Sequence, residues 1–199
     1  MVFINNMRNE GGWWREHVKL LENLDKVMHH FFMPEAHQYL TPILLEFALT
    51  GNKYAQESAC SCLAKIITHQ HHVESRKELM EIIKKEMFES SKWTHRRTFI
   101  IFCKKIITMM PREFFKEFYI KSWIECSQDK IPNVRIEFAS ASVIIRPYFE
   151  NEVNLKIELM EIINNLMNDP DQDVAEAAEN AEYQVINKDN KPRDREQLN

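Results

Sequence analysis

Apolar and aromatic residues recur along this chain at intervals of forty positions, and this period limits the folds that the sequence can adopt. Three positions of the repeat are each filled four times, by Tyr39, Leu79, Tyr119 and Leu159, by Leu40, Met80, Ile120 and Met160, and by Ile43, Ile83, Trp123 and Ile163. Their spacing of i, i+1 and i+4 is that of one helix face. A second series marks the start of another helix at the same period, with Trp14, Tyr54, Thr94, Val134 and Val174. Each unit is therefore predicted to be a pair of helices.

The composition also favours an all-α fold. The chain has 199 residues, 44% of them hydrophobic, which is enough to bury a sizeable core. It contains only three glycines, whereas a sheet protein would need more turns with positive φ. The Gly11-Gly12 pair has no alternating strand on either side, so it gives no hairpin signal.

Charge, cysteine usage and hydropathy narrow the classes of protein further. The formal net charge is -4, which gives no general electrostatic attraction for nucleic acid. The four cysteines lie inside apolar helical patterns without a Cys-x-x-Cys pair, so buried reduced thiols are expected. We see neither a secretory signal nor an apolar run long enough to span a membrane. We therefore expect a cytoplasmic location, which can include the nucleus.

No catalytic motif is found in the sequence. A Gly-rich phosphate loop, His-Glu-x-x-His and a nucleophile elbow are all missing from it, so we predict a protein that is not an enzyme and that uses neither a cofactor nor a small-molecule substrate. His69, His71 and His72 could in principle hold zinc. A solvated loop is the favoured interpretation, because a fourth ligand at a sensible spacing is missing. No metal site is predicted.

Three basic pairs could form a phosphate-contacting stripe across adjacent helices. They are Lys84-Lys85, Arg96-Arg97 and Lys104-Lys105. Glutamates are interspersed among them, and mixed charge of this kind usually marks a solvated face. Nucleic acid is therefore not the partner that we expect.

The turn between the helices of one unit carries a family resemblance. Asp129-x-x-Pro132-Asn133-Val134-Arg135, followed by an apolar helix, resembles the signature of HEAT repeats, and Asp169-x-x-x-x-Val174 repeats its spacing. In that family the aspartate ends the first helix, the valine packs in the turn, and the arginine begins a ladder between units. Other units depart from the pattern, with Glu89 and His95 in the third and Ala175 in the fifth. A ladder through all units is therefore not expected.

A narrower resemblance links the chain to phosphatase subunits. Trp93 to Cys103 and then Asp129 to Arg135 are similar to the C-terminal repeats of the scaffold (A) subunit of type-2A protein phosphatases, and to the HEAT-type regulatory subunits of protein phosphatase 4. Trp14-Arg15-Glu16-His17-Val18 resembles the start of an inner helix in those proteins. This similarity covers about residues 13–187.

The resemblance implies a HEAT-repeat α-solenoid, a right-handed superhelix of about four full hairpins after a partial one. The predicted single array covers residues 1–187, and its repeats are 1–32 (partial), 33–72, 73–112, 113–152 and 153–187. Residues 188–199 lack any apolar period and are expected to be a disordered polar tail.

In the type-2A scaffold, the turns within repeats hold the catalytic and regulatory subunits. Carried over to this chain, the matching partner-binding residues are Trp13, Trp14, Arg15, Lys53, Tyr54, Trp93, Arg96, Pro132, Asn133 and Arg135. The first hypothesis is a non-catalytic scaffold or regulatory subunit that binds a serine/threonine phosphatase catalytic subunit. The alternatives are another protein-binding HEAT or armadillo adaptor, such as a transport or assembly factor, and a HEAT-like enzyme acting on nucleic acid.

Overall fold

The computed structural model describes residues 14–189, with side chains from 15 to 187. They belong to two compact units, the first ending at Ile120 and the second beginning at Lys121. All regular secondary structure in residues 14–189 is helical, so the predicted all-α class is confirmed. Within this part of the chain, no helix is both long enough and apolar enough to cross a membrane.

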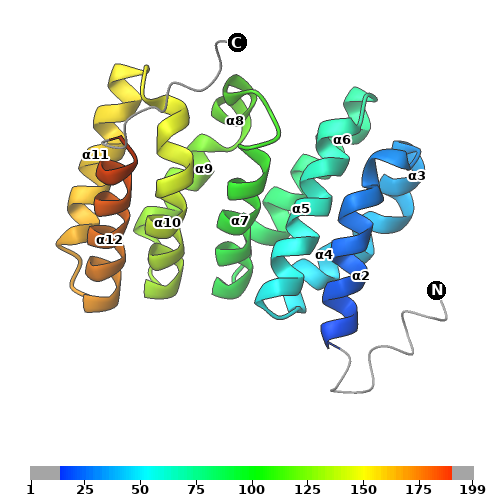
Figure 1. The fold of residues 1–199 in the computed structure, drawn as a ribbon, viewed down its shortest axis with the longest axis horizontal. Helices are drawn as coiled ribbons and strands as arrows, with labels where there is room; N and C mark the ends of the chain where they lie inside the picture. Colours follow the sequence, from blue (N-terminus) through cyan, green and yellow to red (C-terminus); the bar gives the residue numbers. More distant parts are fainter. Residues whose placement is uncertain (1–13, 190–199) are drawn as a thin grey trace, which may run out of the picture. The chain divides into compact units, whose positions relative to one another are not determined.

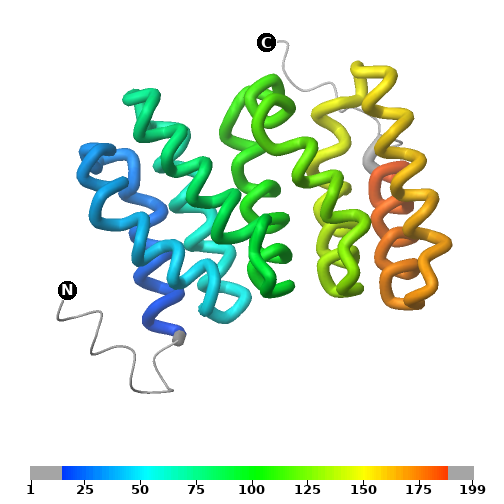
Figure 2. The backbone as a smooth tube through the Cα atoms, turned by 180° about the vertical axis from the view of Figure 1, so that it is seen from behind, coloured from blue at the N-terminus to red at the C-terminus, as the bar shows by residue number. Residues whose placement is uncertain are grey.

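The first unit is built from helices that alternate in direction (Figures 1 and 2). In chain order they are α2 (Trp14–Val27), α3 (Met33–Glu35), α4 (Thr41–Thr50), α5 (Lys53–His69), α6 (Val73–Ile83), α7 (Trp93–Ile106) and α8 (Arg112–Phe118), and α9 (Ile120–Glu125) begins at the last residue of the unit.

Helix α5 lies at the centre of the first unit, because it packs against α2, α4 and α7. It begins at an asparagine cap, where the Asn52 Oδ1 accepts a hydrogen bond of 3.0 Å from the Ala55 backbone N–H. Ala55, Ala59 and Ala64 are buried among Leu63 and other larger side chains, so neighbouring backbones can approach closely. Helices α2, α5 and α7 consequently lie side by side, with their first residues at the same end of the unit (Figure 1).

The first helix of the pair that contains Pro42 is irregular near this proline. A π-helical turn, Ala36–Leu40, directly precedes α4, and Pro42 occupies the first turn of α4. Proline has no backbone N–H to donate to the carbonyl four residues earlier, so the regular ladder cannot pass through it. The wider turn accommodates this interruption.

The same π-helical turn explains one wrong expectation. Tyr39 was assigned to a buried apolar column with Leu79, Tyr119 and Leu159, and those three are buried. Tyr39 is instead 60% exposed. A π-helical turn inserts an extra residue relative to the α-helical period, so it rotates the following side chains to another face. The burial of Ala36 next to it is consistent with that rotation.

The second unit consists of the remainder of α9, α10 (Pro132–Ile145), α11 (Val153–Met167) and α12 (Gln172–Asp189). As expected, Trp123 is fully buried, and its ring stacks on Phe138 with 4.4 Å between centroids. Helix α12 packs on both α10 and α11, and Arg146, the first residue after α10, pairs with Glu182 of α12. The predicted tail, 188–199, lies outside the described residues from position 190 onward.

The second helices of the pairs begin at nearly constant intervals. Their first residues are Trp14, Lys53, Trp93, Pro132 and Gln172, which are 39 or 40 positions apart. The period read from the apolar columns therefore corresponds to a period of real helix starts. How the two units are joined into one array stays a prediction.

The four cysteines are all free and buried, as expected. Cys60 and Cys62 point to different helices, because the Cys60 thiol lies 3.9 Å from the Thr98 carbonyl and the Cys62 thiol lies 3.7 Å from the Leu21 carbonyl. Burial raises the pKa of both thiols from 9.0 to about 12. The folded protein therefore favours the protonated, neutral form of the Cys60 and Cys62 thiols.

We expect Cys60 and Cys62 to resist a thiol reagent such as a disulfide dye at pH 8 while the chain is folded, and all four cysteines to react in concentrated urea. Mass spectrometry would identify the labelled residues. The pKa values of the Cys60 and Cys62 thiols are raised in the folded state. Their contribution to the free energy of unfolding is therefore complete below pH 9.0 and is lost as the pH rises toward about 12. Rapid labelling of Cys60 in the folded protein would contradict this packing.

Candidate partner-binding surface

Arg135 connects two successive turns of the second unit. Its Nε and Nη2 donate hydrogen bonds of 2.8 Å to the two carboxylate oxygens of Asp169, and its Nη1 donates one of 2.7 Å to the Asp129 carbonyl. The two charged side chains are only 13% and 8% exposed. Hydrogen bonds from Arg135 lower the pKa of Asp169. This bidentate pair fixes the spacing of the turns before α10 and α12.

The turns before α10 and α12 each contain the same kind of local hydrogen bond, from a backbone N–H to the side chain of the turn's aspartate. The Asp129 Oδ1 accepts a bond from the Ile131 N–H, and the Asp169 Oδ1 accepts one from the Asp171 N–H, each 2.9 Å long. Val134 and Val174, which follow these turns, are fully buried. The aspartate and the valine thus have the same positions in both turns, as the sequence spacing predicted.

Arg96 binds the backbone of the turn before α7, as Arg135 binds the carbonyl of its own turn. Its Nη1 donates hydrogen bonds of 2.9 and 3.1 Å to the carbonyls of Ser90 and Ser91. His95, at the sequence position equivalent to Arg135, contacts the Ser90 hydroxyl at 3.1 Å. The Ser90 hydroxyl accepts a hydrogen bond of 3.3 Å from the backbone N–H of Lys92, the N-cap residue of α7, whose own side chain makes no capping bond.

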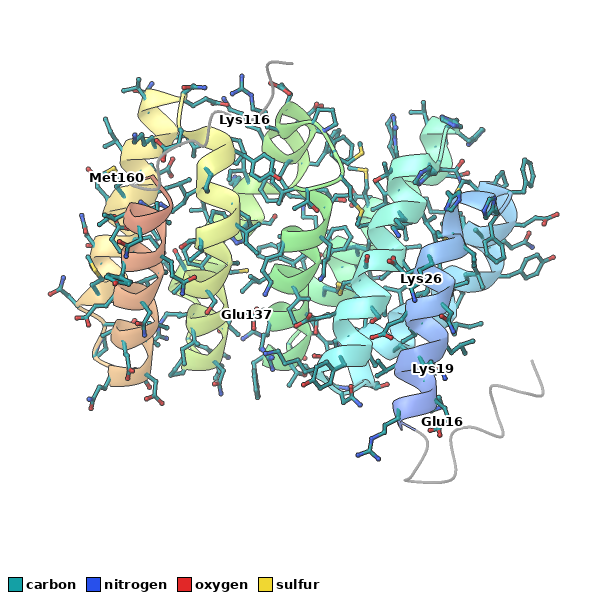
Figure 3. All side chains as sticks on the ribbon, viewed as in Figure 1. Glu16, Lys19, Lys26, Lys116, Glu137 and Met160 are labelled. Atoms are coloured by element: carbon teal, nitrogen blue, oxygen red, sulfur yellow. The ribbon has the colours of Figure 1, made fainter. Side chains whose placement is uncertain are left out.

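The start of α5 offers the clearest candidate contact in the first unit. Lys53 is exposed, and Tyr54 is 63% exposed. Tyr54 borders a hollow of about 300 Å³ that runs along α2, α5 and α7. The other lining residues are Glu22, Asp25, Lys26, Glu57, Ser58, Ser61 and Lys105. Figure 3 shows Lys19 and Lys26 on the surface of α2, which borders this hollow.

Several charged side chains at this hollow form ion pairs within the protein. The Lys65 ammonium lies 2.9 Å from the Asp25 carboxylate, which also accepts a bond of 2.8 Å from the Ser61 hydroxyl. Lys105 lies 4.0 Å from Glu57. Mixed and paired charge of this kind suits a solvated protein-contact surface better than a site for a polyanion.

A second hollow in the first unit contains the histidines singled out in the sequence. Its volume is about 420 Å³, and it is lined by His29, Phe31, Phe32, Met33, Pro34, His69, Gln70, His71 and His72. The His69 ring bonds to the Lys65 carbonyl at 2.8 Å, and the His72 ring caps α6 by accepting from the Ser75 N–H. Within the described residues, no three or more His, Cys, Asp or Glu side chains are arranged to hold a metal ion.

The remaining predicted contact residues are found at helix starts. Arg15 is exposed near the start of α2, Trp93 is half-buried at the first position of α7, and at the start of α10 Pro132 is half-buried and Asn133 exposed. Trp14 is the first residue of α2, and Trp13 lies outside the described residues. In the first unit, the starts of α2, α5 and α7 bring Arg15, Tyr54 and Trp93 to one end (Figure 1). That these residues contact a partner stays a prediction.

Sequence reasoning did not find the polar hollow beside Tyr54. Glu22, Glu57 and Lys105 come from three helices, and nothing in their local sequence marks them as neighbours. The only available signal was the forty-residue period, which places equivalent positions of consecutive inner helices side by side.

Comparison with known proteins gives one distant relationship. The chain is 23% identical over 125 residues to the mouse (Mus musculus) protein "Serine/threonine-protein phosphatase 4 regulatory subunit 4". The aligned stretch covers 62% of this chain and 14% of the mouse protein, so the chain spans a small part of that relative. No family model matches the chain. The chain is thus distantly similar to a phosphatase regulatory subunit.

Replacing Asp169 by asparagine should lower the free energy of unfolding by about 2–3 kcal/mol at pH 7, because it leaves a mostly buried guanidinium without its counter-charge. Urea denaturation would measure the loss. The pKa of Asp169 is below its ordinary 3.8 in the folded state, so the stabilisation is present above pH 3.8 and disappears as the pH falls through the lowered value.

Glu161→Gln is the control for Asp169→Asn, because it removes an exposed carboxylate from the neighbouring α11. Its unfolding free energy should equal that of the wild type within experimental error. Equal stability of Asp169→Asn and the control at pH 7 would show that the pair does not hold the two turns.

Proposed function

We propose that this protein is a non-catalytic regulatory subunit that binds the catalytic subunit of a serine/threonine phosphatase of the type 2A/4 family. The observation that carries the proposal is its similarity over 125 residues to a regulatory subunit of protein phosphatase 4.

The proposed architecture is a single HEAT-type array. Helix starts that recur every 39 or 40 residues support it, as do the equivalent turns at Asp129 and Asp169. The Arg135–Asp169 pair is one rung of the arginine–aspartate ladder of that family. In such an array each pair buries its faces against its neighbours, and the turns along one edge are left for another protein.

The contact with the phosphatase is assigned to the edge formed by the helix starts. Lys53 and Tyr54 are the strongest members, because both are exposed and Tyr54 combines a large apolar ring with a hydroxyl. Asn133 is the corresponding exposed position in the second unit. Binding there would hold the enzyme close to the substrates of the complex and raise their effective concentration, without new chemistry.

Arg96 and Arg135 contribute to this edge indirectly. Both guanidinium groups donate to carbonyls of their own turns, and Arg135 also binds Asp169. Charge reversal of Arg135 would disturb the fold as well as any contact. Variants of Lys53 and Tyr54 therefore test the proposal more cleanly.

We expect Tyr54→Ala to weaken binding of the purified phosphatase 4 catalytic subunit about tenfold or more, because it removes an exposed aromatic anchor. Biolayer interferometry with the immobilised chain would measure the dissociation constant. Tyr39→Ala is the matched control, since Tyr39 is almost equally exposed, at 60% against 63%, but lies on the first helix of its pair. The control should bind as the wild type does.

Lys53→Glu should also weaken this binding, whereas Lys77→Glu, at an exposed position near the start of α6 and so at the opposite end of its helix pair from the α7 start, should not. Circular dichroism would confirm that all four variants keep their helicity. If the catalytic subunit of phosphatase 4 and that of phosphatase 2A both fail to bind the wild-type chain, the proposed function is wrong, and an adaptor for another protein becomes the better hypothesis.

A further inference from the structure

Helix α11 carries an apolar stripe that the described residues of the second unit, 121–189, leave exposed. Val153, Ile157 and Met160 are 68%, 51% and 41% exposed and are spaced by four and three residues, so they lie on one side of the helix. The buried positions Leu159 and Ile163 lie on another side. Figure 3 shows Met160 on the outer side of α11, away from α10.

Helix α12 has a matching stripe. Tyr183 and Ile186 are 69% and 50% exposed, and Glu176 and Glu179 continue the same line toward the start of the helix. At 100° per residue, the exposed stripe of each helix is rotated by about 130° about the helix axis from the buried side chains of that helix, in the sense in which the chain winds. Because α11 and α12 are antiparallel neighbours, this equal rotation turns both stripes to the same side of the pair, the side away from α10 (Figure 1).

The two stripes together form a surface that we name the end face, made of Val153, Ile157, Met160, Tyr183, Ile186, Glu176, Glu179 and Asn164. Its two halves differ in chemistry. The start of α11 lies beside the end of α12, so the apolar side chains gather at one end of the face. Glu176 and Glu179 lie at the other end, beside Asn164, and neither stripe carries a basic residue.

This division excludes a second copy of the chain as a good partner. Two identical faces related by a two-fold axis can align in two ways. If like ends meet, Glu176 and Glu179 of one copy oppose those of the other. If unlike ends meet, the carboxylates of Glu176 and Glu179 are buried against Tyr183 and Ile186 of the other copy. This is unfavourable, because the carboxylates lose their hydration and gain no positive charge as a partner.

We propose that the end face is a docking surface for a helix of another protein that carries an apolar ridge followed by lysine or arginine residues. The ridge would cover Ile157, Met160 and Tyr183, and the basic residues would pair with Glu176 and Glu179. This is the recognition of an amphipathic helix through its i, i+3, i+4 and i+7 positions, with direction set by charge. It uses a surface separate from the helix starts assigned to the phosphatase.

The test uses two synthetic helical peptides of about 18 residues, long enough to form an amphipathic helix. Both carry the same leucine ridge; one has two lysines near one end, and its twin has two glutamates there. Isothermal titration calorimetry with the full chain should show that the lysine peptide binds about fivefold tighter or more, as expected for two exposed charge pairs. Glu176→Lys combined with Glu179→Lys should reverse this preference.

Ile157→Asp and Tyr183→Asp should each weaken the lysine peptide about tenfold. Gln184→Asp is the control, because it adds the same charge at an exposed position of α12 outside the stripe, and it should bind like the wild type. Equal binding of the two peptides, or no binding of either, would overturn the proposal. So would a dimer of the chain, seen by light scattering, that Tyr183→Asp dissociates.

Discussion

Small side chains on α5, α10 and α12 let neighbouring helices of the same unit approach closely, and the rest of the structure depends on this contact. Ala59 and Cys60 on α5, Ala139 on α10, and Ala178 and Ala181 on α12 are all buried. Large residues such as Phe99, Phe138 and Leu63 fill the space around them. Within each unit, a helix therefore buries its apolar side against its neighbours, as α5 does against α2, α4 and α7 and α12 against α10 and α11.

Polar contacts then fix the spacing that apolar packing leaves open. Arg135 binds the carboxylate of one turn and the carbonyl of the preceding turn, and both turns use an aspartate to organise their own backbone. In the first unit, the Asp25 carboxylate of α2 forms an ion pair with Lys65 and accepts a hydrogen bond from the Ser61 hydroxyl, both on the neighbouring helix α5. The Arg135–Asp169, Ser61–Asp25 and Lys65–Asp25 contacts join residues 34, 36 and 40 positions apart, so the period of the sequence is also a period of these interactions.

The period allowed the helix pairs, the exposed starts of the inner helices and most positions of the buried columns to be predicted from the sequence, although Met160 in the second column is 41% exposed. It could not predict the π-helical turn Ala36–Leu40, because the insertion of one residue within a helix leaves no mark in composition. Tyr39 was therefore assigned to the wrong face. The engagement of Arg96 and Arg135 within their own turns also depends on side-chain directions that spacing alone does not give. The polar hollow beside Tyr54 joins three helices and was missed for the same reason.

In the proposed array, successive helix pairs are translated along one axis, and distances between spin labels test this proposal most directly. Labels on cysteines introduced at Lys53, Asn133 and Gln172 would mark exposed starts of inner helices, while the native cysteines stay buried. With about 10 Å between neighbouring helix axes, the array predicts about 20 Å from Lys53 to Asn133 and about 30 Å from Lys53 to Gln172. A Lys53–Gln172 distance below about 20 Å, as in a closed helical bundle, would contradict the account.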